Sequence, residues 1–144
     1  MGMRLLAVLA AAAAALALAM PSLGERSSTV AAHASAYGTI LFDGRGFVLY
    51  VFTRDARGSS ACTGACAKAW PPFLVRARPS AGRGATGRLV GTIRRSDGTR
   101  QVTYAGRPLY YYVGDRTPGQ ILCQDVVEYG GRWLVLRPSG KPVT

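Results

Sequence analysis

Two aspartates occupy matching places in a repeated pattern and are the residues best placed for acid–base chemistry. Asp55 and Asp115 each stand three residues after a strand aromatic and shortly before a glycine, Gly58 or Gly119. Two carboxylates brought together can act as general acid and base. An aspartate at a strand end can instead accept hydrogen bonds from the backbone N–H groups of the following turn. We favour this second interpretation, because duplication preserves a structural cap in both copies.

The chain has one histidine, His33, which falls in the N-terminal segment that we assign to a leader or spacer. The remaining sequence then has no Ser-His or Cys-His nucleophile pair and no imidazole metal ligand. The sequence therefore predicts a protein that is not an enzyme, with no catalytic residues and no cofactor.

Three cysteines, Cys62, Cys66 and Cys123, could form a disulfide or bind a soft metal. In an oxidising compartment Cys62 and Cys66 are near enough in sequence to close a short loop, and Gly64 allows the distortion that this needs. A Cys62–Cys66 disulfide is the favoured prediction. Two alternatives stay open. Cys123 could bridge to either of the other two, or all three thiolates could bind an ion such as Cu(I) in a redox or soft-metal envelope protein.

Four aromatic side chains, Tyr50, Phe52, Tyr110 and Tyr112, lie at two-residue spacing on expected strands. The two members of each pair therefore share one strand face. They could fill a core that is covered on both sides, or they could form an exposed face that stacks on a sugar or a planar ring. The core interpretation is favoured, and the exposed face is kept as the candidate binding site.

These motifs belong to an internal repeat. Gly46-x-x-Leu49-Tyr50-x-Phe52-x-x-Asp55 matches Gly106-x-x-Leu109-Tyr110-x-Tyr112-x-x-Asp115, sixty residues later. A tryptophan follows each copy at a similar distance, and we interpret Trp70 and Trp133 as equivalent core anchors. Two copies of this length indicate two half-domains related by a pseudo-two-fold axis rather than a solenoid array.

The elements that must position these residues are predicted to be strands. Alternating apolar stretches separated by glycine-containing turns predict strands over residues 37–42, 47–53, 89–95, 100–104, 109–113 and 132–136. Residues 62–70 predict a short helix, ended by two prolines, and residues 76–88 predict a long exposed loop. The expected fold is all-β, a small antiparallel sandwich or barrel-like domain of two related halves.

The N-terminus has the features of an export signal. Arg4 precedes an apolar run over residues 5–20 that is short for a membrane span. Cleavage could follow Ala19 or Ala34, and an uncleaved N-terminal anchor is the alternative. We assign residues 1–34 to a signal peptide and spacer, and residues 35–144 to the all-β domain.

The 144-residue chain is strongly basic, with 18 Lys and Arg against 7 Asp and Glu and a net charge of +11. Its length predicts a single domain. A solvated surface accounts for such a charge, and an anionic envelope polymer or lipid head groups are the functional alternative. The densest basic segment holds Arg76, Arg78, Arg83 and Arg88. A nucleic-acid partner is not expected, because the sequence has no basic helix, zinc-ligand spacing or RNA-binding aromatic motif.

Five stretches between residues 37 and 138 carry a family resemblance. They are Leu49-Tyr-Val-Phe-Thr-Arg-Asp55, Cys62-Thr-Gly-Ala-Cys-Ala67, Trp70-Pro-Pro72, Arg95-Ser-Asp-Gly-Thr-Arg-Gln-Val-Thr-Tyr104 and Gly106-Arg-Pro-Leu-Tyr-Tyr-Tyr112. They resemble a family of secreted or lipoprotein repeats of unknown function with a Tyr-x-aromatic-x-x-Asp motif. The chain departs from that family in lacking a lipid-accepting cysteine and in having Cys123-Gln-Asp125 where the family is glycine-rich.

The resemblance implies an exported fold and names no activity. With the residues above, it predicts an exported, non-enzymatic cell-envelope or extracellular module. Its ligand and its oligomeric state are left unassigned.

Overall fold

The computed structural model describes residues 28–144. The apolar run of the expected signal peptide and the cleavage position after Ala19 lie outside the described residues.

Within residues 28–144, nine strands form three small sheets, which confirms the all-β fold class. The first sheet has the order β2-β1-β4, the second β3-β9-β8 and the third β5-β6-β7. All strand pairs are antiparallel except β1 with β4. The strand bounds are β1 Thr29–Ser35, β2 Gly38–Asp43, β3 Tyr50–Phe52, β4 Ser80–Ala81, β5 Val90–Arg94, β6 Arg100–Tyr104, β7 Arg107–Pro108, β8 Val126–Glu128 and β9 Gly131–Val135.

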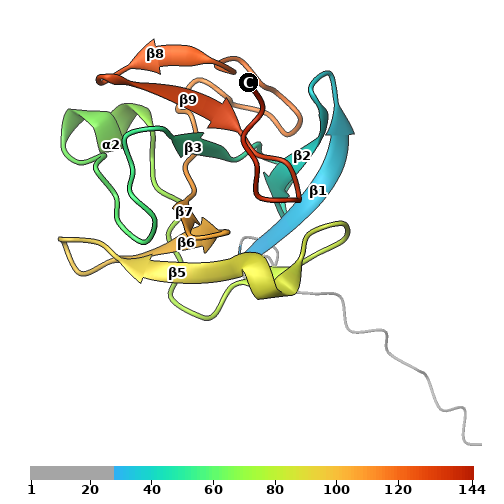
Figure 1. The fold of residues 1–144 in the computed structure, drawn as a ribbon, viewed down its shortest axis with the longest axis horizontal. Helices are drawn as coiled ribbons and strands as arrows, with labels where there is room; N and C mark the ends of the chain where they lie inside the picture. Colours follow the sequence, from blue (N-terminus) through green and yellow to red (C-terminus); the bar gives the residue numbers. More distant parts are fainter. Residues whose placement is uncertain (1–27) are drawn as a thin grey trace, which may run out of the picture.

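The helix α2 (Ala65–Ala69) lies beside the β3 end of the second sheet, and a 3-10 turn, η1 (Gly87–Leu89), leads into β5. The helix is shorter than the predicted 62–70, because the chain before it is turned by Gly64 at a φ of +56°. Figure 1 shows the three sheets arranged around a common interior. The predicted strand over 109–113 is reduced to isolated bridges that Tyr110 makes to Tyr50 and to Pro72.

The central strand β3 separates two hydrophobic clusters. Val51 points into one cluster, together with Leu49, Val102 and Leu134. Tyr50 and Phe52, on the opposite face of the strand, belong to a second cluster that holds the tryptophans and the disulfide. Because side chains alternate across a strand, one short strand serves both clusters.

The backbone repeats its contacts about a pseudo-two-fold relation, as the sequence repeat predicts. Tyr50 donates its N–H to the Tyr110 carbonyl at 2.8 Å, and Tyr110 returns the same bond to Tyr50 at 2.9 Å. The N–H of Gly58 binds the Gly106 carbonyl, and that of Gly119 binds the Gly46 carbonyl, both at 2.9 Å. Each copy of the motif is therefore completed by the backbone of the other copy.

The structure corrects the predicted start of the domain. Residues 29–34, assigned above to the spacer, form most of β1, and Val30 is fully buried. The N–H of Ala32 bonds to the Arg83 carbonyl, and the Val30 carbonyl accepts the Gly82 N–H. His33 consequently belongs to the domain, exposed on β1 with its ring beside Phe42. Cleavage after Ala34 would remove a strand from the core.

We expect the folded domain to require residues 29–34. A chain that begins at Ser35 should lose about 3 kcal/mol or more relative to one that begins at Ser28, because it exposes the groove that Val30 fills and breaks the ladder to β2. Denaturant unfolding of the two chains measures the difference, and the intact mass of the secreted protein locates the cleavage. Equal midpoints, or a secreted chain that begins at Ser35, would contradict this expectation.

Candidate functional site

The centre of the molecule is an exchange of hydrogen bonds between the two motif copies. The Tyr50 hydroxyl of the first copy donates to Asp115 of the second at 2.7 Å. The Tyr110 hydroxyl of the second copy donates to Asp55 of the first, also at 2.7 Å. The sequence repeat matched these residues within each copy, whereas the structure pairs them between copies.

The second carboxylate oxygen of each aspartate binds the loop that follows its motif. Asp55 accepts the Ala61 N–H at 2.7 Å, and Asp115 accepts the Leu122 N–H at 3.0 Å. Locally, the N–H of each aspartate bonds to the carbonyl three residues earlier, on Phe52 or Tyr112, so that the chain turns tightly there. In each copy, one oxygen of the aspartate thus binds the backbone of its own loop, and the other oxygen binds the tyrosine of the other half-domain.

The electrostatics of these four groups follow from burial. Burial raises the pKa of Asp55 and of Asp115 above the ordinary value, against the hydrogen bonds that each carboxylate accepts. Burial, followed by the neighbouring aspartate, also raises the pKa of Tyr50 well above its ordinary range. The Tyr110 pKa is raised in the same way, chiefly by burial. The tyrosines therefore remain protonated donors, and a negative charge on either aspartate is disfavoured by its surroundings.

The two aspartates do not form the direct carboxylate pair that acid–base chemistry would use. Each has both oxygens engaged by donors from the protein, a tyrosine hydroxyl and a backbone N–H. The arrangement can therefore hold turns and join halves, and the geometry of these two residues is that of caps.

The predicted aromatic binding face is not formed. Tyr50, Phe52 and Tyr110 are at most 2% exposed, and Tyr112 is half-buried beside them. Their rings pack within the second cluster, where Tyr50 meets Trp70 edge-on at 5.2 Å and Phe52 stacks on Trp133 at 4.2 Å. These side chains fill the interior, as the favoured core interpretation has it, and they present no groove to a ligand.

The two tryptophans lie against each other at the junction of the halves. Their rings stack at 4.0 Å with an interplanar angle of 4°. Both indole N–H groups reach Glu128, that of Trp70 the carboxylate at 2.8 Å and that of Trp133 the carbonyl at 3.2 Å. Trp70 and Trp133 are therefore one contact across the pseudo-two-fold relation, not two separate anchors.

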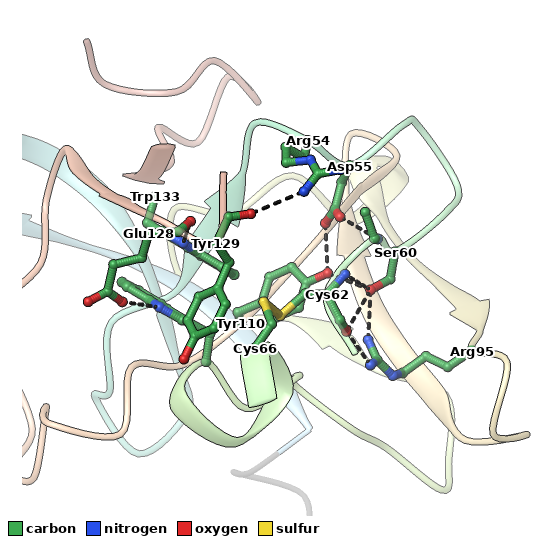
Figure 2. Close-up of a disulfide and its surroundings, with 12 residues drawn as sticks. Arg54, Asp55, Ser60, Cys62, Cys66, Arg95, Tyr110, Glu128, Tyr129 and Trp133 are labelled. Carbon is green, nitrogen blue, oxygen red and sulfur yellow. Dashed lines mark hydrogen bonds between the residues drawn. A yellow bond between two sulfur atoms is a disulfide. The ribbon is translucent and has the colours of Figure 1, made fainter. Parts of the chain in front are cut away.

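The Cys62–Cys66 disulfide predicted from the sequence is present, with the two Cα atoms 5.3 Å apart. Figure 2 shows it beside Tyr110, at the start of the helix. Cys123 is unpaired and half-buried, and burial is the main cause that raises the pKa of its thiol. Because Cys62 and Cys66 are joined to each other, neither bridges to Cys123, and the three-thiolate arrangement is not formed. Among residues 28–144, no group of three or more His, Cys, Asp or Glu side chains could hold a metal ion.

Sequence reasoning missed a buried cation, Arg95, which it counted with the solvated charges. The residue is 8% exposed and donates to Ser60, to Gln101 and to the Cys62 carbonyl at 2.7–2.9 Å. These partners are separated by up to 35 residues in sequence. The sequence marked Arg95 only as the last residue of a predicted strand before a Ser-Asp-Gly turn, and no local signal indicates that Ser60 and Cys62 enclose it.

The fold and this centre define a duplicated all-β domain that is joined across its halves by reciprocal tyrosine–aspartate bonds. A family described as a secreted repeat of unknown function matches residues 31–73 and 91–137, and the chain belongs to this family. Each matched segment holds one copy of the Tyr-x-aromatic-x-x-Asp motif and its tryptophan. No curated protein and no solved structure matches the chain. Within residues 28–144, the helices are too short or too polar to cross a membrane.

We expect Asp55→Ala and Asp115→Ala each to lower the free energy of unfolding by about 2 kcal/mol, because each leaves a tyrosine hydroxyl and a backbone N–H without an acceptor. Asp→Asn should recover much of this loss at neutral pH. The amide keeps an acceptor for the N–H, and a neutral group suits a site where burial disfavours charge. Denaturant midpoints of the four variants measure the effect. Four midpoints equal to that of the parent would refute the capping role.

Truncating either tryptophan should be the most damaging single change in the second cluster. Trp70→Ala or Trp133→Ala should cost about 3–5 kcal/mol, since each empties half of one stacked pair. Because the rings contact each other, the double variant should lose less than the sum of the single losses. Additive losses in this double-mutant cycle, measured by urea unfolding, would show that the rings act independently.

Proposed function

We propose that this chain acts outside the cytoplasm as a non-enzymatic module that binds an anionic envelope polymer through exposed arginines. The proposal rests on one observation: the acidic side chains are bonded within the protein, whereas most of the basic side chains in residues 28–144 form no ion pair. Three charged residues precede residue 28, so the described part carries 16 basic and 6 acidic side chains.

The six acidic side chains are all engaged within the protein. Asp43 binds Arg45 and Tyr111, Asp55 and Asp115 bind the tyrosines, Asp97 binds Thr99, Asp125 binds Arg132, and Glu128 binds Trp70. Only two ion pairs form among residues 28–144, at Arg45 and at Arg132. Most of the positive charge therefore has no acidic partner within the described residues, and its field extends to about 8 Å at physiological ionic strength.

The loop of residues 76–88 contributes to two neighbouring clefts on this basic surface. Arg76 and Arg100 line a cleft of about 490 Å³ with the exposed side chain of Leu74. Arg78 and Arg100 line a second cleft, of about 260 Å³, over β5. Arg100 belongs to both, so the cations follow one another along the surface. Such a row suits an extended polyanion better than a flat array of lipid head groups.

We expect a variant with Arg76, Arg78, Arg83 and Arg88 all changed to Ser to bind a purified envelope polyanion at least about tenfold more weakly in low salt. The difference should vanish near 1 M salt, where the Debye length is about 3 Å. Equilibrium binding at increasing salt measures both effects.

The matched control changes four exposed cations elsewhere, Arg57, Arg116, Arg137 and Lys141, to Ser. The net charge falls by the same amount, and exposed positions of this kind leave stability nearly unchanged. Equal weakening in both variants would mean that diffuse charge binds the polymer and would overturn the loop as the contact. Tighter binding to anionic vesicles than to the polymer would identify a lipid surface, and not the polymer, as the partner.

A further inference from the structure

A small polar cavity lies between the loop of residues 58–63 and the tip of the β5–β6 hairpin. It has a volume of about 140 Å³, and its side chains are Ser59, Ser60, Thr63, Arg94, Arg95 and Ser96. These are hydroxyls and guanidinium groups, with no carboxylate among the lining residues. The cavity is therefore dominated by hydrogen-bond donors and positive charge.

Arg95 forms the back of this cavity and has no charged partner within bonding distance. Its three hydrogen bonds end on neutral acceptors, the Ser60 hydroxyl, the Gln101 side-chain carbonyl and the Cys62 main-chain carbonyl. In Figure 2 Ser60 stands between the Arg95 guanidinium and the pair formed by Asp55 and Tyr110. A guanidinium has five N–H groups, so these three bonds leave two for another acceptor.

A buried cation without a direct counterion is costly, because burial removes the water that solvates it. The nearest route to a carboxylate runs through two hydroxyls, from Ser60 to Tyr110 and on to Asp55. An anion seated in the cavity would supply the missing charge directly. Arg94 is exposed at the cavity and could close on it from the solvent side.

The other half of the duplicated domain shows what the fold requires at this place. In β1–β2 His33 pairs with Ile40, as Ile93 pairs with Gln101 in β5–β6. Ala34 and Ser35 therefore stand where Arg94 and Arg95 stand. In the same way, Gly119 and Ile121 occupy the places of Gly58 and Ser60. Asp115 accepts the N–H of Leu122, which follows Ile121, and Asp55 accepts the N–H of Ala61, which follows Ser60.

The equivalent cavity in that half is lined by Ala34, Ser35, Gly119 and Ile121, together with Tyr37 and Phe42. His33 also lines this cavity, and its lining residues include no Lys or Arg. The same backbone thus carries a cavity without Lys or Arg in one half and a cationic, hydroxyl-rich cavity in the other. Arginines at these positions are not needed to build a half-domain, which points to a ligand in the half that has them.

We propose that the cavity of Ser59, Ser60, Thr63, Arg94, Arg95 and Ser96, the cationic cavity, binds a phosphate group. Two guanidinium groups and the three hydroxyls of Ser59, Thr63 and Ser96 supply donors from several directions, which matches a tetrahedral anion whose oxygens each accept hydrogen bonds. The fourth hydroxyl, that of Ser60, is already bonded to Tyr110 and Arg95 and holds the guanidinium in place. The volume admits such a group and excludes a large ligand. This site is separate from the clefts of Arg76, Arg78 and Arg100 and does not rest on polymer binding there.

The test is a titration of the folded protein with inorganic phosphate at constant ionic strength, followed by amide chemical shifts. Saturable shifts confined to residues 58–63 and 94–97 are expected. Arg94→Gln should weaken phosphate binding about tenfold, and Ser96→Ala should weaken it severalfold. Both residues are exposed, so neither change should prevent folding. Arg116→Gln, an exposed arginine outside the cavity, is the matched control and should leave the affinity unchanged.

A parallel titration with a soluble glycerophosphodiester distinguishes a free phosphate from one held in a larger molecule. Saturation in either arm supports the site, and the tighter arm identifies the source. Shifts that do not saturate, or equal weakening by Arg94→Gln and Arg116→Gln, would overturn the proposal. The four-fold Ser variant of residues 76–88 should keep the phosphate titration intact, so this site and the polymer contact can fail independently.

Discussion

The reciprocal bonds from Tyr50 to Asp115 and from Tyr110 to Asp55 are the constraint on which the rest of the structure depends. A buried tyrosine hydroxyl must find an acceptor, and in each half the acceptor is supplied by the other half. The same two tyrosines exchange backbone bonds, so their main chains and side chains are fixed together. Neither half-domain can satisfy its own polar groups alone, which makes the pair a single cooperative unit.

Around this shared centre the halves have diverged. The first half holds a disulfide beside its tyrosine network, whereas the second has the single thiol of Cys123. Cys123 stands where Cys62 stands in the repeat, and its N–H approaches the Tyr50 hydroxyl at 3.4 Å. The packed centre preserves symmetry because any change there affects both halves. The surface around the packed centre is free to differ between the halves, and the cationic cavity lies on that surface.

The acidic and the basic side chains also have different roles in this structure. The carboxylates serve turns, tyrosines and an indole inside or close to the packed domain, where each has a defined donor. The arginines of the 76–88 loop lie outside, where hydration alone compensates them. Arg95 is the exception, a buried cation held by neutral groups next to the disulfide. The protein is basic toward its surroundings because Lys and Arg outnumber Asp and Glu, and because three of the carboxylates, those of Asp43, Asp55 and Asp115, are buried or half-buried.

The sequence by itself predicted the strands β2, β3, β5, β6 and β9, the repeat and the short helical segment, and it favoured the Cys62–Cys66 bond over its alternatives. Each of these rests on local information: two-residue alternation, turn chemistry, or a spacing of a few residues. The first strand escaped prediction because residues 29–35 are small and weakly apolar, and such a segment resembles a spacer until a partner strand covers it. The burial of Tyr50, Phe52 and Tyr110 was predictable as the favoured alternative, since both faces of their strands are apolar.

Only the tertiary structure decided which copy supplies the acceptor for each tyrosine, that Trp70 stacks on Trp133, and that Arg95 is buried. Alternation identifies the face on which a side chain lies, but it does not identify the segment that packs against that face. The partners of Tyr50 and Arg95 lie 65 and 35 residues away. Such pairings are fixed by the packing of the two halves about their pseudo-two-fold relation, a property of the folded chain and not of any local pattern.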